Sequence, residues 1–296
     1  MSAHPRLSLN QATIKHASLE QALHEVARAG YRSIGLWREP VAEVGLERAT
    51  ELVKESGLRV SSLCRGGFCT AEPGPAQQEA LADNRRAIDE TAALAEAGAD
   101  GSRPVLVLVA GGLPGGSKDL AGARERVTDV IGGLAPYAKS AGVTLAVEPL
   151  HPIFAADRAV VSTLAQAIDI AENAGPEVGV VVDTYHVWWD PDVLAQIARA
   201  GAAGRIASYQ VCDWLVPVPA DNLLGRGLMG DGTIDFGPLT RAVLAAGYTG
   251  DIEVEIFNRQ LWDAPFADVA ARVSARFDEF IAAQLPAPVP ADERSR

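Results

Sequence analysis

The sequence predicts a single-domain (β/α)₈ TIM barrel, and three observations lead to this fold class. Short apolar runs alternate with longer amphipathic helical runs, and this unit recurs eight times. Glycines at positions 30, 57, 142 and 247 stand where a helix would end just before a strand. The length of 296 residues suits one barrel of about 250 residues with additions. A doubly wound open sheet is the alternative, which the lack of a glycine-rich nucleotide fingerprint makes weaker.

The eight expected strands are short and mostly apolar, as is typical of strands covered on both faces. In chain order they span residues 7–10, 33–37, 60–64, 104–109, 143–148, 179–183, 206–211 and 251–256.

The expected helices fill the gaps between these strands and follow the last one. They span residues 18–29, 46–55, 76–97, 119–140, 163–174, 191–200, 238–246 and 268–283. Ser18 opens the first as a capping residue, and Pro191 after Asp190 is typical of a first helical turn. The barrel is therefore expected over residues 1–285. Residues 286–296, rich in proline and charge, form a tail that we expect to be disordered.

Composition excludes several classes of protein. With 26 Lys and Arg against 38 Asp and Glu, the net charge of −12 argues against a general nucleic-acid binder. No apolar run reaches the roughly 18 residues of a membrane helix, and the N-terminus lacks a secretory pattern. The three cysteines, Cys64, Cys69 and Cys212, fit neither a closed disulfide framework nor zinc-finger spacing. We therefore expect a cytoplasmic protein with no membrane partner.

In a TIM barrel the catalytic groups lie at the carboxyl ends of the strands. Four consecutive expected strands, the fifth to the eighth, carry Glu148, Asp183, Gln210 and Glu255 near these ends. Any one carboxylate there can be explained as a helix cap or as the partner of a rim arginine. Three carboxylates at one mouth, however, repel each other unless a cation or protons neutralise them. The set predicts a divalent metal bound by oxygen ligands.

Tryptophans follow several of the strands. Trp37 ends the second, and Trp188 follows the sixth. Their ordinary role is to pack loops over the barrel, but an aromatic face also stacks on the C–H face of a sugar. We expect at least one of the two to line the substrate pocket.

The motifs at the strand ends resemble a known family. They are Val-Glu-Pro at 147–149, Val-Asp-Thr-Tyr-His at 182–186, Gln-Val-Cys-Asp-Trp at 210–214, Gly-Asp-Gly-Thr-Ile-Asp at 230–235 and Glu-Val-Glu-Ile-Phe at 253–257. Over about residues 5–285 the chain resembles the sugar-phosphate isomerase/epimerase superfamily, the xylose isomerase-like group of TIM barrels. This group includes ketose 3-epimerases, hydroxypyruvate isomerase, inosose isomerase and dehydratase, and endonuclease IV.

The resemblance implies that one metal is held by Glu148, Asp183, Gln210 and Glu255. Gln210 departs from the pattern, because many members carry His there. An amide oxygen can also bind a metal, so the site becomes an all-oxygen one that favours Mn²⁺ or Mg²⁺ over Zn²⁺.

The implied reaction is isomerisation or epimerisation of a sugar or polyol ketone through an ene-diolate, with Glu148 and Glu255 as the acid–base pair. His186 is implied to contact substrate oxygens, and Arg226 to bind substrate hydroxyls or a phosphate. His151 is a second candidate for substrate contact or acid–base work, with a loop cap as the equal alternative. Asp213 lies past its strand end, where it would support the site or cap a loop.

Three other functions remain open. A lyase on the same scaffold, either inosose dehydratase-like or cleaving 3-keto-glycosides, would use the same enolisation but expel a leaving group. A non-catalytic sugar-binding barrel is disfavoured by the intact carboxylate set. A nuclease is the weakest alternative, because the chain holds only five histidines. The expected partner is a small sugar or polyol, and a homo-oligomer is expected from the resemblance.

Overall fold

Eight parallel strands close into a barrel in the computed structural model, which describes residues 3–285. Around the barrel the order is β1, β10, β7, β6, β5, β4, β3 and β2, and β2 pairs with β1 again. The bounds are β1 Leu7–Asn10, β2 Ser33–Trp37, β3 Arg59–Gly67, β4 Val105–Val109, β5 Thr144–Glu148, β6 Val178–Asp183, β7 Ile206–Val211 and β10 Ile252–Val254. The predicted TIM barrel is confirmed.

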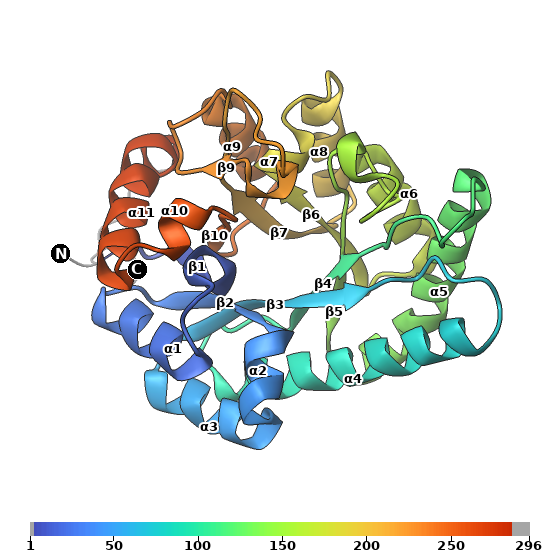
Figure 1. Ribbon diagram of the computed structural model, residues 1–296, viewed down its shortest axis with the longest axis horizontal. Helices are drawn as coiled ribbons and strands as arrows, with labels where there is room; N and C mark the ends of the chain where they lie inside the picture. The colour runs from blue at the N-terminus through green and yellow to red at the C-terminus, as the bar shows by residue number, and fades with distance from the viewer. Residues whose placement is uncertain (1–2, 286–296) are drawn as a thin grey trace, which may run out of the picture.

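Eight longer helices form a ring outside the strands (Figure 1). They are α1 Leu19–Arg28, α3 Leu46–Ser56, α4 Pro75–Ala97, α5 Leu120–Ser140, α6 Leu164–Ala174, α8 Val193–Ala202, α9 Phe236–Ala245 and α11 Phe266–Phe280. The last helix, α11, packs beside α1 and so completes the ring (Figure 1). No helix within residues 3–285 has the length and apolar character needed to cross a membrane.

Three short helices follow strands directly and were not predicted from the sequence pattern. They are α2 Arg38–Val44, α7 Thr184–Val187 and α10 Arg259–Trp262. Short 3₁₀ turns cover Gln11–Ile14, Pro152–Phe154, Asn222–Leu224 and Ala282–Gln284. These elements have three to seven residues, so they show too little periodicity to be recognised in a sequence.

Two strand ends differ from the expected ones by more than one residue. The third strand runs on to Gly67, because Gly66 and Gly67 pair with Leu108 and Val109 of β4. The last strand stops at Val254, and the backbone N–H of Ile256 donates to the Thr13 hydroxyl instead of a neighbouring strand.

The start of helix α1 agrees with the sequence prediction, and the start of helix α8 does not. Ser18 and Gln21 form a complete capping box at the start of α1. Helix α8 begins at Val193, two residues after the expected start at Pro191, and its cap Asp192 makes no side-chain cap bond. The expected disordered tail, residues 286–296, lies outside the described part of the chain.

The inside of the barrel is divided into an apolar and a polar part. The apolar part contains Cys64, Val105, Val107, Ala146, Val181 and Ala207 from β3 to β7. The polar part contains the buried residues Ser8, Asn10, Ser62, Gln210 and Glu253, which come from β1, β3, β7 and β10. A polar group inside a barrel must be hydrogen-bonded to be tolerated, so this half of the interior forms a network.

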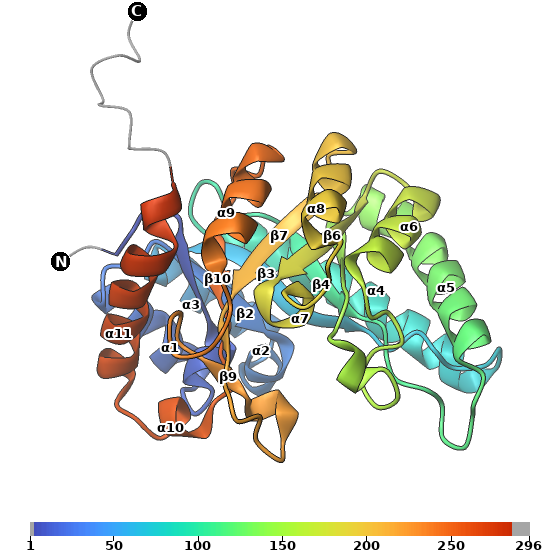
Figure 2. The same ribbon diagram turned by 90° about the horizontal axis from the view of Figure 1, so that it is seen from above.

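The long segment after β7 folds back over the barrel mouth. Within it, β8 Asp213–Trp214 and β9 Arg226–Gly227 form a two-stranded antiparallel ribbon. Figures 1 and 2 show β9 and α10 near each other, and the Asn258 side chain before α10 donates to the carbonyl of Arg226. This folding fixes Arg226 above the strand ends.

Candidate active site

A cavity of about 500 Å³ opens at the carboxyl ends of the strands. Its inner wall contains Glu148, His186, Arg226 and Glu255. Glu148 is the last residue of β5, while Glu255 follows the end of β10 by one residue. All four side chains are buried, although each bears a polar or charged group. The structure therefore brings together residues from four separate parts of the chain that the sequence singled out.

Arg226 is the centre of this cluster. Its Nη1 donates to Oδ2 of Asp183 at 3.1 Å and to Oε2 of Glu255 at 2.9 Å. Its guanidinium lies over the ring of Tyr185 at 4.7 Å and that of Phe257 at 5.0 Å. The sequence analysis expected Arg226 to bind substrate; in the structure it forms ion pairs with two of the three carboxylates.

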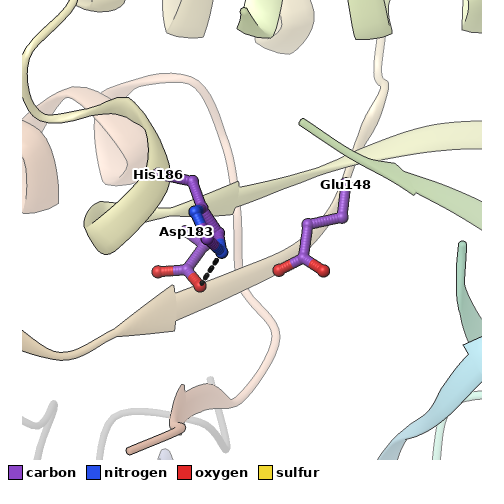
Figure 3. Close-up of side chains that lie close together, drawn as sticks. All are labelled: Glu148, Asp183 and His186. Carbon is purple, nitrogen blue, oxygen red and sulfur yellow. Dashed lines mark ion pairs between the residues drawn. The ribbon is translucent and has the colours of Figure 1, made fainter. Parts of the chain in front are cut away.

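Glu148, Asp183 and His186 offer a possible metal site. One ligand atom of each lies within 4.8 Å of the others. Figure 3 shows Asp183 and His186 side by side, linked by a 3.8 Å contact, and Glu148 across from them. Oε1 of Glu148 is buried and has no hydrogen-bond partner among the described residues. A buried carboxylate oxygen without a donor is the kind of atom that a cation would satisfy.

Gln210 lies in β7, level with Asp183 of β6 on one side and with Glu253 of β10 on the other. Its Nε2 donates to Oε1 of Glu253 at 3.1 Å. Its own Oε1 is buried and accepts no hydrogen bond from any described residue. Glu255, which sequence reasoning placed at the same depth, stands two residues further toward the mouth.

The chemistry of this donor set fits a divalent cation. The carboxylates of Glu148, Asp183 and Glu255 provide negative charge, and Glu148 and Gln210 each hold a buried oxygen with no partner in residues 3–285. Oxygen donors of this kind suit Mg²⁺ or Mn²⁺. The single lone pair of a neutral His186 already accepts the N–H of His151 at Nδ1, so the oxygen atoms are the donors that remain for a cation. The residues present therefore fit the metal that the sequence analysis expected.

The two histidines differ in their surroundings. Nδ1 of His186 accepts from the backbone N–H of His151 at 3.0 Å, while its Nε2 lies 3.0 Å from Nη2 of Arg226. Both ring nitrogens thus face donors, and a neutral imidazole has only one lone pair to offer. An oxygen entering beside Arg226 and His186 would relieve this conflict. His151 lies over the Trp214 ring, and its Nδ1 caps the following 3₁₀ turn through the N–H of Ile153.

Burial and mutual repulsion shift the acid–base properties of the cluster. Burial, with the charges of Glu255 and Asp183, holds the pKa of Glu148 well above its usual value. Burial raises the pKa of Glu255 to about 7, against the opposing charge of Arg226. The pKa of Asp183 is also raised by burial, and that of His186 is lowered well below its usual value by burial and by Arg226. A carboxyl group whose pKa lies near neutral pH, as that of Glu255 does, can both take and give protons.

The outer wall of the cavity is aromatic and basic. Trp37, Phe68 and Phe257 contribute rings, and Arg65 lies over the rings of both Trp37 and Phe68. Of the two tryptophans considered for this role, Trp37 lines the cavity, whereas Trp188 packs against Trp214.

Sequence reasoning missed Glu253, Asn10 and the outer-wall residues Lys15 and Phe68. Glu253 could have been found in the sequence, because it stands two residues before Glu255. Residues two apart in a strand face the same side, so both side chains point to the inner face of the barrel. Nothing comparable marks Phe68, whose place depends on how the segment after β3 turns.

The chain also matches known proteins. The family described as xylose isomerase-like TIM barrel matches residues 23–277. An L-ribulose 3-epimerase from Mesorhizobium japonicum is 25% identical over 258 residues, which cover 85% of this chain and 80% of the relative.

Solved structures share the fold. A protein from Sinorhizobium meliloti 1021 is 48% identical with a TM-score of 0.88, covering 93% of this chain and 98% of the other. The IOLI protein, solved with a bound zinc atom, is 18% identical with a TM-score of 0.80, covering 95% of this chain and all (100%) of the other. At that identity the second likeness bears on the fold alone.

Proposed function

Since this chain belongs to the xylose isomerase-like TIM barrel family, we propose that it is a divalent-metal-dependent isomerase or epimerase of a sugar or polyol ketone. The observation that carries the proposal is the pair of buried carboxyl groups, Glu148 and Glu255, which both line the cavity at the barrel mouth. They come from β5 and the end of β10, which are separated in the barrel by β6 and β7. They are therefore suited to reach a substrate from two sides.

We assign the metal to Glu148, Asp183, Gln210 and Glu255, with Mn²⁺ or Mg²⁺ as the preferred ion. When bound, the ion would polarise the substrate carbonyl and so acidify the neighbouring C–H bond. The unpaired oxygens of Glu148 and Gln210 support this assignment.

The protons are moved by the two glutamates. One carboxylate removes the proton beside the carbonyl to give an ene-diolate of the substrate. Return of a proton to the adjacent carbon isomerises the sugar, and its return to the opposite face of the same carbon epimerises it. The L-ribulose 3-epimerase relative favours the second outcome for a free ketose.

Arg226 and His186 would hold the substrate oxygens. Both residues border the cavity. Because Nδ1 of His186 accepts from His151, its Nε2 is left as a donor beside Nη2 of Arg226, and a substrate hydroxyl or carbonyl oxygen would accept from both groups. Trp37 would lie against the C–H face of the sugar from the outer wall.

The direct test replaces each glutamate in turn. Glu148→Gln and Glu255→Gln should each lower turnover of a ketose by about 10²–10⁴-fold, the usual contribution of a general acid or base. Circular dichroism should show both variants folded. Activity retained by both would refute the mechanism, and a wild-type protein that binds neither Mn²⁺ nor Mg²⁺ would favour a non-catalytic sugar-binding barrel.

A second candidate is a lyase that enolises the same kind of ketone and then expels a leaving group. The outer wall of the cavity favours it, because Trp37, Arg65 and Phe68 extend the site beyond its carboxylates and suit an aglycone. Mass spectrometry of the products separates the two functions. An isomerase conserves the substrate mass, whereas a lyase releases water or an aglycone.

A further inference from the structure

Glu253 is a buried carboxylate that the proposed mechanism does not use. Its side chain is 1% exposed and lies inside the barrel, two residues deeper than Glu255. Strand β2, which β1 separates from β10, makes room for it, because a Cβ atom at Gly35 would lie 2.6 Å from Cδ of Glu253. A carboxylate in such a position needs donors on several sides.

Donors from three strands meet this carboxylate. Asn10 Nδ2 donates at 2.7 Å, Ser61 Oγ at 2.5 Å, Ser62 Oγ at 2.9 Å and Gln210 Nε2 at 3.1 Å. Since these groups surround both oxygens, Glu253 acts as the acceptor at the centre of the network.

The direction of the Asn10 amide is fixed from its other end. Its Oδ1 accepts from the backbone N–H of Ala12 at 2.9 Å and from Nε1 of Trp37 at 2.7 Å. Asn10 must therefore turn its amino group to Glu253, which confirms that Glu253 accepts there. The same rule applies to Gln210, because a carboxylate that only accepts hydrogen bonds cannot face an amide oxygen.

We propose that Glu253 is a positioning residue, which holds the Gln210 amide with its amino group inward and its Oε1 free to bind the metal. The proposal rests on the metal site of the proposed function. Oε1 of Gln210 is buried and without a partner in the described chain. An amide turned the other way would present an N–H₂ group, which cannot bind a cation. Glu253 thereby lets an amide fill a metal-ligand position.

The test is a double-mutant cycle read by Mn²⁺ affinity, measured by titration calorimetry and electron paramagnetic resonance without substrate. Glu253→Gln should weaken Mn²⁺ binding about ten-fold, as is typical when a group that orients a metal ligand is lost. Gln210→Ala should weaken it at least as much. In the Gln210→Ala background, Glu253→Gln should cause no further loss, because it acts through Gln210.

Ser8→Ala is the matched control. Ser8 bonds to Ser61 at 2.8 Å in the same network but does not touch Gln210, so its loss should leave Mn²⁺ affinity unchanged. Circular dichroism checks folding. If Glu253→Gln does not fold, Glu253→Asp replaces it, since the shorter side chain keeps the charge but draws it away from Gln210.

The outcomes separate this inference from the proposed function. A Glu253→Gln variant that binds Mn²⁺ as tightly as the wild type, or that loses equal affinity in both backgrounds, overturns the positioning role and leaves the metal site intact. A wild-type protein that binds no Mn²⁺ overturns both.

Discussion

Nη1 of Arg226 lies 2.9 Å from Oε2 of Glu255, and both side chains are almost fully buried. The same nitrogen also reaches Asp183. A permanent positive charge from the loop after β7 thus compensates carboxylates from two other strands. Arg226 is therefore the cation that faces two of the carboxylates at the barrel mouth.

Removal of that charge should destabilise the metal-free protein. Arg226→Gln leaves Asp183 and Glu255 without a counter-charge, which typically costs about 3–5 kcal/mol for a buried pair. Added Mn²⁺ should restore part of the loss. Arg276→Gln, whose bonds to Asp231 and Glu279 lie near the surface, is the control and should cost only about 0–1 kcal/mol. Urea unfolding measures both, and equal losses would argue against a central role of Arg226.

The stability of the metal-free protein should depend on Glu255. Its pKa rises from the reference 4.5 to about 7 on folding, mainly through burial. The folded state therefore holds this proton more tightly than the unfolded chain does. Its contribution to stability is complete below pH 4.5 and is lost as the pH rises through about 7. We expect the melting temperature in chelator to fall over that interval, and to fall less in Glu255→Gln. Identical pH profiles for the two proteins would contradict this.

Metal preference should follow the residue at position 210. Gln210→His replaces an oxygen donor by an imidazole nitrogen, which Zn²⁺ binds more readily than Mn²⁺ does. The affinity for Zn²⁺ relative to Mn²⁺ should increase by about ten-fold or more. Competition titrations with the two ions measure the ratio. An unchanged ratio would mean that position 210 is not a ligand.

Gly35 should be required for the placement of Glu253. Gly35→Ala brings a methyl group against that carboxylate, so we expect a loss of about 1–3 kcal/mol in the free energy of unfolding. Mn²⁺ affinity should fall with it. Gly115→Ala is the control, because a Cβ atom there would meet no heavy atom within 4 Å. A Gly35→Ala protein as stable as this control would contradict the close approach.

Asp213 should hold the segment that carries Arg226. Its two oxygens accept from the backbone N–H groups of Trp214, Gly230, Gly232 and Ile234. Asp213→Ala leaves these donors unpaired and should lower stability by about 3 kcal/mol. Asp235→Ala, which removes an exposed helix cap, should cost about 1 kcal/mol. Proteolysis within the segment should accelerate only in Asp213→Ala, and equal cleavage of both variants would contradict this role.

Much of the barrel could be read from the sequence, because strands buried on both faces and amphipathic helices leave distinct periods. The strands at β1, β2 and β7 have the expected bounds, and Glu148 and Asp183 end their strands as expected. Such positions are local, since they depend on where one strand stops.

The relations across the barrel could not be read in this way. The inward direction of Glu253 and Glu255 follows from alternation, but their depth depends on strand register. The pairing of Arg226 with Asp183 and Glu255 depends on the segment after β7, which folds back over the barrel mouth through the β8–β9 ribbon.

The sequence by itself determined the family of fold, the set of carboxylates and the end of the barrel where they gather, because periodicity and strand ends are properties of nearby residues. The tertiary structure decided that Arg226 stands between Asp183 and Glu255, and that Glu253 faces the amino group of Gln210. Arg226 and Asp183 are 43 positions apart in the sequence, as are Gln210 and Glu253. Arg226 and Glu255 are 29 positions apart. Only closure of the barrel brings such residues within hydrogen-bond distance.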